Sequence, residues 1–85
     1  MQIFFTSKFR KSYKKLTAEL KNQAKQKEKI FRKNPLDSKL KTHKLHGKYK
    51  NYWSFSVSAS YRIIFDFASE NKVVFIDVGD HDIYN

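Results

Sequence analysis

Residues 51–79, NYWSFSVSASYRIIFDFASENKVVFIDVG, decide the fold because they contain three apolar runs separated by short polar turns. The first run, at 51–58, alternates large apolar side chains with serines, which predicts a strand with one apolar and one hydroxyl face. The second run, at 61–67, alternates again, and the third, at 73–79, is almost wholly apolar. Three consecutive strands joined by short turns predict an antiparallel meander. The apolar side chains that define its first two strands are Trp53, Phe55, Val57, Tyr61, Ile63, Phe65 and Phe67.

The residues before this meander predict one strand and a first helix. QIFFT, at 2–6, is a short run of β-branched and aromatic residues typical of a strand. Thr6 or Ser7 can cap the helix that follows, because either hydroxyl can accept a hydrogen bond from a backbone N–H of the first turn. Helical spacing then places three side chains on one face, namely Phe9, Tyr13 and Leu16.

A second helix is predicted from a cap at Thr17 to about Arg32. The Asn34–Pro35 dipeptide ends it, because the residue before a proline is pushed out of helical geometry. Its apolar face carries Leu20, Ala24, Ile30 and Phe31. Residues 35–50, PLDSKLKTHKLHGKYK, are polar and basic without clear periodicity, and we interpret them as a loop or linking arm.

In this order the elements predict a single α+β domain over residues 1–85, arranged β-α-α-β-β-β. The sheet is expected to be small, twisted and antiparallel, with the helical hairpin packed on its apolar face. Eight Phe, five Tyr and one Trp allow so short a chain to build a core, because each aromatic ring buries a large apolar area.

Positive charge is concentrated in the first part of the chain. The formal net charge is +10; residues 1–50 hold 16 Lys and Arg against three acids, and residues 51–85 hold two against five. Such a basic segment favours binding to a polyanion, whether RNA, DNA, an anionic membrane or an acidic protein. A lysine-rich solvated surface is the other interpretation of the same pattern.

Several classes of protein are excluded by what the chain lacks. There is no cysteine, so no disulfide framework or thiolate metal site is expected. No apolar run approaches the roughly 20 residues of a membrane span, and MQIFF is too short for a signal peptide. With only two glycines there is no glycine-rich phosphate loop, and we expect no cofactor. The cytosol is the expected compartment.

Arg62 is the first candidate functional residue because it interrupts an otherwise apolar strand, on the face opposite Ile63 and Phe65. A guanidinium keeps its charge permanently and matches phosphate oxygens two at a time, so Arg62 is a candidate phosphate anchor. The alternative is a structural arginine whose head group pairs with Asp66, the second residue further along on the same face of the strand.

His81 and Tyr84 follow the last predicted strand in the stretch GDHDIYN. Histidine titrates near neutrality, so His81 is a candidate acid or base, with Asp80 and Asp82 able to orient its ring. Tyr84 could stack on a nucleotide base or donate a proton. The alternative is a frayed tail without function.

Two further histidines, His43 and His46, lie in the lysine-rich stretch THKLHGKYK. Neither a cysteine nor a carboxylate lies at a spacing that completes a metal site, so no metal is predicted. The stretch is either a phosphate-binding arm or a basic loop that Leu45 anchors.

Three stretches together resemble the RelE/ParE superfamily of bacterial toxin–antitoxin modules: HKLHG at 43–47, YWSFSVSASYRIIF at 52–65 and VVFIDVGDHDIY at 73–84. The opening IFFTSKFRKSYKKL fits too, so the resemblance covers nearly the whole chain. It implies a compact sheet with two helices on one side. For the RelE, YoeB and YafQ branches it implies a ribosome-dependent endonuclease that cuts mRNA in the A site. The ParE branch inhibits DNA gyrase and does not cut RNA.

The resemblance also assigns roles to residues. Arg62 matches the strand arginine that supports the scissile phosphate, and His81 matches a C-terminal histidine that acts as acid or base. Tyr84 matches the aromatic residue near the end of these chains, and His43 a histidine that YafQ-like members keep before their LxG turn. The lysines expected to hold ribosomal RNA are Lys41, Lys44, Lys48 and Lys50.

The resulting hypothesis is a toxin that cleaves mRNA without a metal, by attack of the RNA 2′-hydroxyl, with Arg62 and His81 at the scissile phosphate. The expected partners are the ribosome, mRNA and a cognate acidic antitoxin that forms a hetero-oligomer with the toxin; no membrane is involved. Two alternatives remain: a ParE-like gyrase inhibitor without nuclease activity, and a catalytically degenerate member that only binds its antitoxin.

Overall fold

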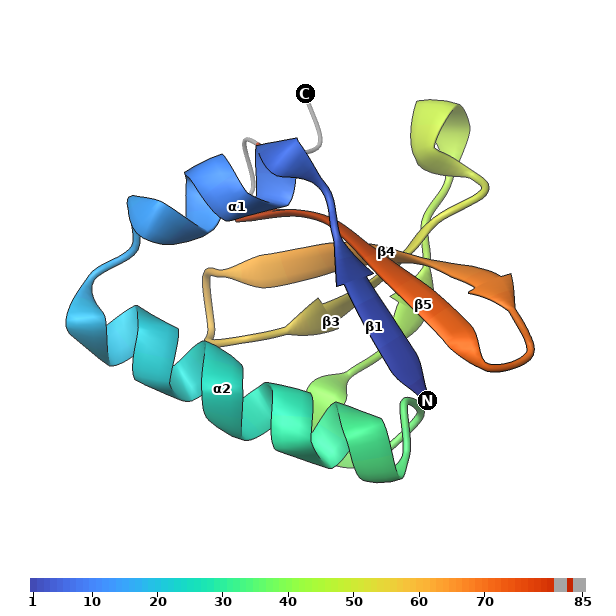
Figure 1. Cartoon of the computed structure of the whole chain (residues 1–85), viewed down its shortest axis with the longest axis horizontal. Coiled ribbons are helices and arrows are strands. Elements are labelled where there is room, and N and C mark those ends of the chain that lie inside the picture. The colour runs from blue at the N-terminus through green and yellow to red at the C-terminus, as the bar shows by residue number, and fades with distance from the viewer. Residues whose placement is uncertain (81–82, 84–85) are drawn as a thin grey trace.

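The computed structural model of the protein describes residues 1–80 and residue 83. A five-stranded sheet has the strand order β1-β5-β4-β3-β2 (Figure 1). The helices and strands are β1 (Gln2–Phe5), α1 (Ser7–Lys14), α2 (Ala18–Lys33), β2 (His43–Lys44), β3 (Trp53–Ser56), β4 (Arg62–Ser69) and β5 (Lys72–Gly79). Two single-turn 3₁₀ helices, η1 (Ser38–Leu40) and η2 (Gly47–Tyr49), flank β2.

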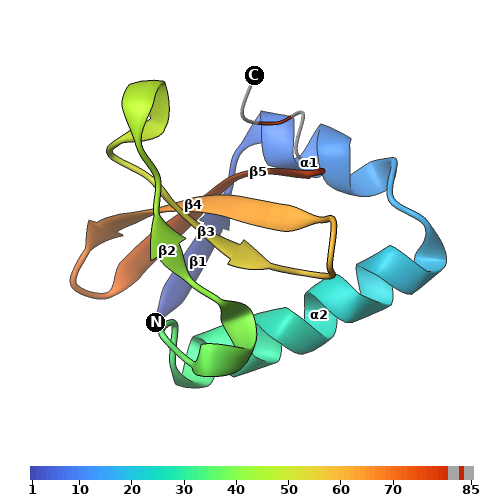
Figure 2. The same ribbon diagram turned by 180° about the vertical axis from the view of Figure 1, so that it is seen from behind.

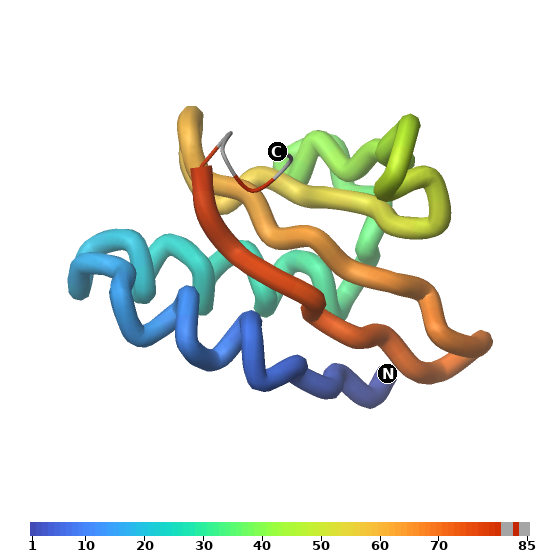
Figure 3. The backbone as a smooth tube through the Cα atoms, turned by 90° about the horizontal axis from the view of Figure 1, so that it is seen from above, coloured from blue at the N-terminus to red at the C-terminus, as the bar shows by residue number. Residues whose placement is uncertain are grey.

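The predicted α+β class and the order of its main elements are confirmed. Helices α1 and α2 form a hairpin on one side of the sheet (Figures 1 and 3). The segment from β2 to η2 lies away from helix α1, as the view from behind shows (Figure 2). One face of the sheet is therefore covered by the two helices. The segment from β2 to η2 (residues 43–49), which we call the arm, lies on the other side.

The sheet differs from the prediction at its two edges. It is mixed, not wholly antiparallel, because β1 pairs in parallel with β5, with Ile3 opposite Val73. The two-residue strand β2 adds a fifth strand by pairing antiparallel with β3, with His43 opposite Ser54. The apolar run at 2–6 identified a strand but held no information on the direction of its partner. Strand β2 has only two residues, which is too short for the alternation of side chains typical of a strand to be recognised in the sequence.

The core is built around Phe31 of α2, which is completely buried. Its ring centroid lies 4.9 Å from those of Phe55 on β3 and Phe65 on β4, and 5.5 Å from that of Phe75 on β5. One side chain thus contacts the three central strands. Aromatic pairs at these distances contribute about 0.5–1.5 kcal/mol each beyond the apolar area that they bury.

Thr6 joins the first strand, the first helix and the last strand. Its hydroxyl oxygen accepts a hydrogen bond from the N–H of Phe9 at 3.0 Å, which caps α1, and its O–H donates to the carbonyl of Ile76 at 2.7 Å. Its own N–H donates to the carbonyl of Phe75 at 3.2 Å. Thr17 caps α2 through the N–H of Leu20 at 3.2 Å, so both predicted caps are confirmed.

Asp77 attaches α1 to β5. It is buried, and its carboxylate accepts hydrogen bonds from Ser12 Oγ at 2.6 Å and from the N–H of Val78 at 2.9 Å. Lys8 Nζ lies 3.7 Å from the other carboxylate oxygen. A buried charge needs such partners, because an unpaired carboxylate inside a protein is strongly destabilising.

None of the helices in the described part of the chain is long and apolar enough to cross a membrane.

Phe31→Ala is expected to lower the free energy of unfolding by about 3–5 kcal/mol, because it leaves a cavity where α2 contacts three strands. Urea denaturation followed by far-ultraviolet circular dichroism measures this loss. Phe4→Ala is the matched control, since Phe4 is 49% exposed, and it should cost less than about 1.5 kcal/mol. Equal losses for the two variants would contradict the central role of Phe31.

Candidate functional site

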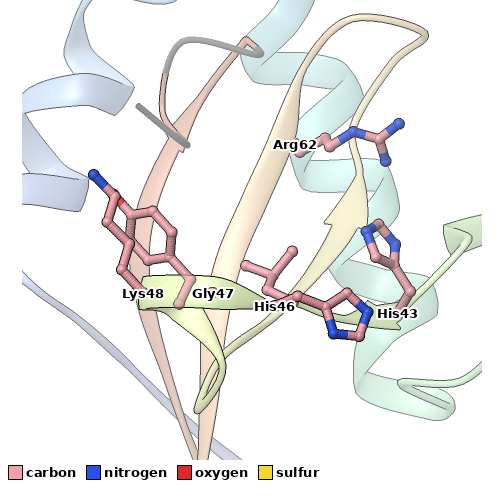
Figure 4. A pocket seen from close by; sticks show the side chains of 7 residues that line it. His43, His46, Gly47, Lys48 and Arg62 are labelled. Atoms are coloured by element: carbon pink, nitrogen blue, oxygen red, sulfur yellow. The ribbon is translucent and has the colours of Figure 1, made fainter.

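A cavity of about 530 Å³ opens between the β2–η2 arm and strand β4. Figure 4 shows it with the guanidinium of Arg62 and the imidazole of His43 near each other on one side and Lys48 on the other. The lining residues are His43, Leu45, His46, Gly47, Lys48, Tyr49 and Arg62.

Arg62 is held on β4 by a serine of the neighbouring strand. Its Nη1 donates a hydrogen bond of 3.0 Å to Ser56 Oγ, and Ser56 is its direct cross-strand partner. Among the described residues Arg62 forms no ion pair, so the alternative pairing with Asp66 is wrong. A guanidinium has five N–H donors, and one bond to a neutral hydroxyl leaves its positive charge uncompensated.

His43 is oriented by two contacts. Its Nδ1 lies 3.1 Å from the carbonyl oxygen of Lys41, and its Nε2 lies 3.4 Å from Ser54 Oγ. A carbonyl oxygen only accepts, so Nδ1 carries the proton and donates it. In the neutral ring Nε2 is then the unprotonated nitrogen, the atom able to take a proton.

The backbone at Lys41 has a left-handed conformation, with φ of 52°. This conformation costs a side-chain-bearing residue about 1–2 kcal/mol. Lys41 follows η1 directly, and its conformation turns the chain toward β2. The carbonyl that fixes His43 thus comes from a strained residue, which is a feature often found at functional sites.

His46 and Tyr49 also line the cavity; His46 belongs to the stretch predicted as a phosphate-binding arm or a basic loop, whereas Tyr49 was not predicted. His46 is exposed, while Tyr49 is half-buried, with Lys48 Nζ 5.2 Å from its ring centroid. Gly47, at φ of 68°, makes the turn between these two residues. That glycine, one of only two in the chain, was the available signal for a turn that gathers its neighbours. Within residues 1–80 and 83, no three His, Asp or Glu side chains gather where they could hold a metal ion.

The four lysines predicted to bind RNA are all exposed: Lys41, Lys44, Lys48 and Lys50. Lys48 alone among them lines the cavity. Lys44 follows His43 on β2, and successive side chains of a strand point to opposite faces, so it projects away from the side of His43.

His81 and Tyr84, predicted as acid or base and as stacking residue, lie outside the described residues. Gly79 and Ile83, which flank His81 in the sequence, are linked to residues that line the cavity. Gly79 is the cross-strand partner of Arg62, and the hydroxyl of Tyr49 donates a hydrogen bond of 3.1 Å to the carbonyl of Ile83.

A second cavity, of about 640 Å³, lies between helices α1 and α2. Its apolar lining comes from Phe5, Phe9, Tyr13, Ala24 and Ile63, and its charged lining from Arg10, Lys14, Lys25, Glu28 and Lys29. Burial, and to a lesser degree the Glu28 carboxylate, raises the pKa of the Tyr13 hydroxyl, which therefore stays protonated at neutral pH. We call this second cavity the helix groove.

Solved structures of bacterial and archaeal toxins have the same fold. A YoeB/ParE toxin from Agrobacterium tumefaciens superposes with a TM-score of 0.79 at 19% identity, covering 95% of this chain and 99% of that one. YafQ from E. coli gives 0.78 at 21% identity, covering 98% and 96%. The RelB–RelE antitoxin–toxin complex from Methanococcus jannaschii gives 0.75 at 22% identity, covering 96% and 95%. At such identities the likeness concerns the fold.

Comparison with curated proteins finds no match. The family described as "Bacterial toxin of type II toxin-antitoxin system, YafQ" matches residues 1–84, which is almost the whole chain. The protein therefore belongs to the YafQ family of bacterial type II toxins, within the RelE-like group that the sequence resembled.

Proposed function

We propose that this toxin is an endoribonuclease that cuts mRNA on the translating ribosome in the cytoplasm. The observation that carries the proposal is the cavity in which Arg62, fixed on a strand, shares one wall with the oriented imidazole of His43. A permanent cation beside a proton carrier is what the cleavage of a phosphodiester requires.

The proposed reaction uses the 2′-hydroxyl of the RNA as nucleophile. A base removes its proton, the oxygen attacks the phosphorus, and the bond from phosphorus to the 5′-oxygen breaks. An acid protonates the leaving 5′-oxygen, which yields a 2′,3′-cyclic phosphate and a 5′-hydroxyl. Each positioned proton transfer contributes roughly 10²–10⁴-fold to the rate.

Arg62 stabilises the negative charge that grows on the phosphate in the transition state. The hydrogen bond to Ser56, which is only 7% exposed, holds the guanidinium in place before the substrate arrives. Preorganised donors of this kind are effective because they need no rearrangement during the reaction.

His81 is the proposed principal acid or base, and His43 the second proton carrier. His43 supports this role through its unprotonated Nε2. For His81 the support is its position two residues after Gly79, which pairs with Arg62. Tyr84 is proposed to stack on or orient the nucleotide.

The exposed lysines Lys41, Lys44, Lys48 and Lys50 are proposed to bind phosphates of ribosomal RNA and mRNA. Such contacts position a nucleic acid without reading its sequence. A protein with a net charge of +10 attracts RNA in general. The ribosome would supply the alignment of the scissile phosphate that loose attraction does not give.

Arg62→Ala is expected to slow mRNA cleavage by about 10²–10³-fold, since it removes the cation at the phosphate. His81→Ala is expected to slow it by about 10²–10⁴-fold through the loss of a proton carrier. A translating-ribosome assay with primer extension measures both rates. Arg32→Ala is the matched control, because Arg32 is an exposed residue of α2 that pairs with Glu28; it should cut like the parent protein.

The assignment fails if Arg62→Ala and His81→Ala both cut mRNA like the parent. Intact mRNA together with inhibited DNA supercoiling would instead indicate a gyrase inhibitor. Intact mRNA and normal supercoiling, with tight antitoxin binding, would indicate a degenerate member.

We further propose that a cognate antitoxin binds the helix groove through an acidic segment that folds on the toxin. Two of the structurally similar toxins were solved in complexes with antitoxins, DinJ with YafQ from E. coli and RelB with RelE. The groove offers an apolar floor and four basic residues against one acidic residue. An amphipathic acidic segment matches both features.

The double variant Lys25→Glu/Lys29→Glu should weaken antitoxin binding by about tenfold or more, because like charges then face each other. Calorimetric titration at 50 and 300 mM salt measures this effect, which should shrink at the higher salt concentration. Lys72→Glu, at the start of β5 and outside the groove, is the matched control and should change Kd by less than twofold. An unchanged Kd for the double variant would indicate that the antitoxin binds outside the helix groove.

A further inference from the structure

Gly79 has no conformational reason to be glycine. Its φ lies outside the left-handed range, so the backbone there is open to other residues. Space is the constraint instead, since a Cβ at this position would clash with Cγ2 of Ile83. Non-bonded carbon atoms cannot overlap in this way without a displacement, and the nearby atom belongs to a branched side chain. Ile83 therefore occupies the place of the missing side chain.

The same contact fixes the face on which Ile83 lies. Gly79 is directly opposite Arg62 in the β4–β5 ladder. Residues directly opposite each other in a ladder project to the same face of the sheet. The missing Cβ of Gly79, and with it Ile83, thus lies on the face that carries the guanidinium of Arg62.

Tyr49 holds Ile83 from the other side. Its hydroxyl donates to the carbonyl of Ile83 at 3.1 Å, and the N–H of Ile83 donates to the carbonyl of Asp80 at 3.2 Å. Tyr49 itself belongs to η2 and lines the cavity with Arg62 and His43. The hydrogen bond thus joins the arm to the residues after β5 across 34 positions of sequence.

We infer that Tyr49, Gly79 and Ile83 form a latch that holds Ile83 against β5 on the face of the sheet that carries Arg62. This inference rests on the proposed function, because His81 lies between Gly79 and Ile83 in the sequence. Gly79 is held by its pairing with Arg62, and Ile83 by the Tyr49 hydroxyl. The latch residues do not touch the reacting atoms; they are positioning residues for the proposed acid or base.

Four variants test the latch. Tyr49→Phe removes only the hydroxyl, and Gly79→Ala displaces Ile83. Ile83→Ala removes the Cγ2 that would clash but keeps its Cβ, which lies at an ordinary 3.7 Å from the added atom. The double variant Gly79→Ala/Ile83→Ala should therefore restore the space. Tyr61→Phe, a half-buried tyrosine packed against the core, is the control for loss of a hydroxyl.

The first measurement is independent of activity. The ¹H–¹⁵N heteronuclear NOE of the amide at position 83 should fall clearly in Tyr49→Phe and in Gly79→Ala. In the double variant, the NOE of that amide should equal its value in Ile83→Ala. Tyr61→Phe should match the parent.

The second measurement is single-turnover cleavage of mRNA on the ribosome. The rate at saturation should fall about 3–10-fold in Tyr49→Phe and at least tenfold in Gly79→Ala, while the concentration for half-saturation stays unchanged. The double variant should cut at the rate of Ile83→Ala. A merely destabilised protein would show less active toxin but the same rate per folded molecule.

The outcomes separate the two proposals. A parent protein that cuts no mRNA overturns the proposed function, and the positioning role falls with it. An active parent whose Gly79→Ala and Tyr49→Phe variants keep the parental rate overturns the latch alone. The latch is also overturned if the Ile83 amide keeps its NOE in Gly79→Ala.

Discussion

The contact of one phenylalanine ring with three strands organises this molecule. Phe31 meets Phe55, Phe65 and Phe75 at once, so α2 can lie on only one face of the sheet. Thr6 and Asp77 then fasten α1 to β5 on the same side. The main core cluster lies on that face, while the opposite face carries Arg62 and two serines beside the buried Ile64.

On the opposite face, two small polar residues hold the candidate functional side chains in place. Ser54 and Ser56 are buried, and their hydroxyls form hydrogen bonds with the ring of His43 and the guanidinium of Arg62. The helix-covered face thus provides most of the core, while the serine face provides hydrogen bonds that orient the groups of the proposed chemistry.

The sequence predicted the elements well where a period or a cap specified them, as at Thr6, Thr17 and the strand around Arg62. It could not predict the partner of the Arg62 head group. Asp66 lies four residues along the same strand, so its backbone is about 13 Å from that of Arg62. Ser56, in contrast, is the direct cross-strand partner of Arg62 because of the register between β3 and β4. Tyr49 was missed, and His46 was predicted only as part of a basic stretch, because residues 43–49 have no periodicity and their position relative to β4 depends on the turn at Gly47.

The parallel pairing of β1 with β5 has a consequence for biosynthesis. The cap hydroxyl of Thr6 and its acceptor on Ile76 are 70 residues apart. At the usual speed of translation, roughly 5–20 residues per second, β5 is synthesised about 4–14 s after β1. The nascent chain therefore completes its sheet only after β5 has left the exit tunnel, and until then the Thr6 hydroxyl lacks its acceptor on Ile76.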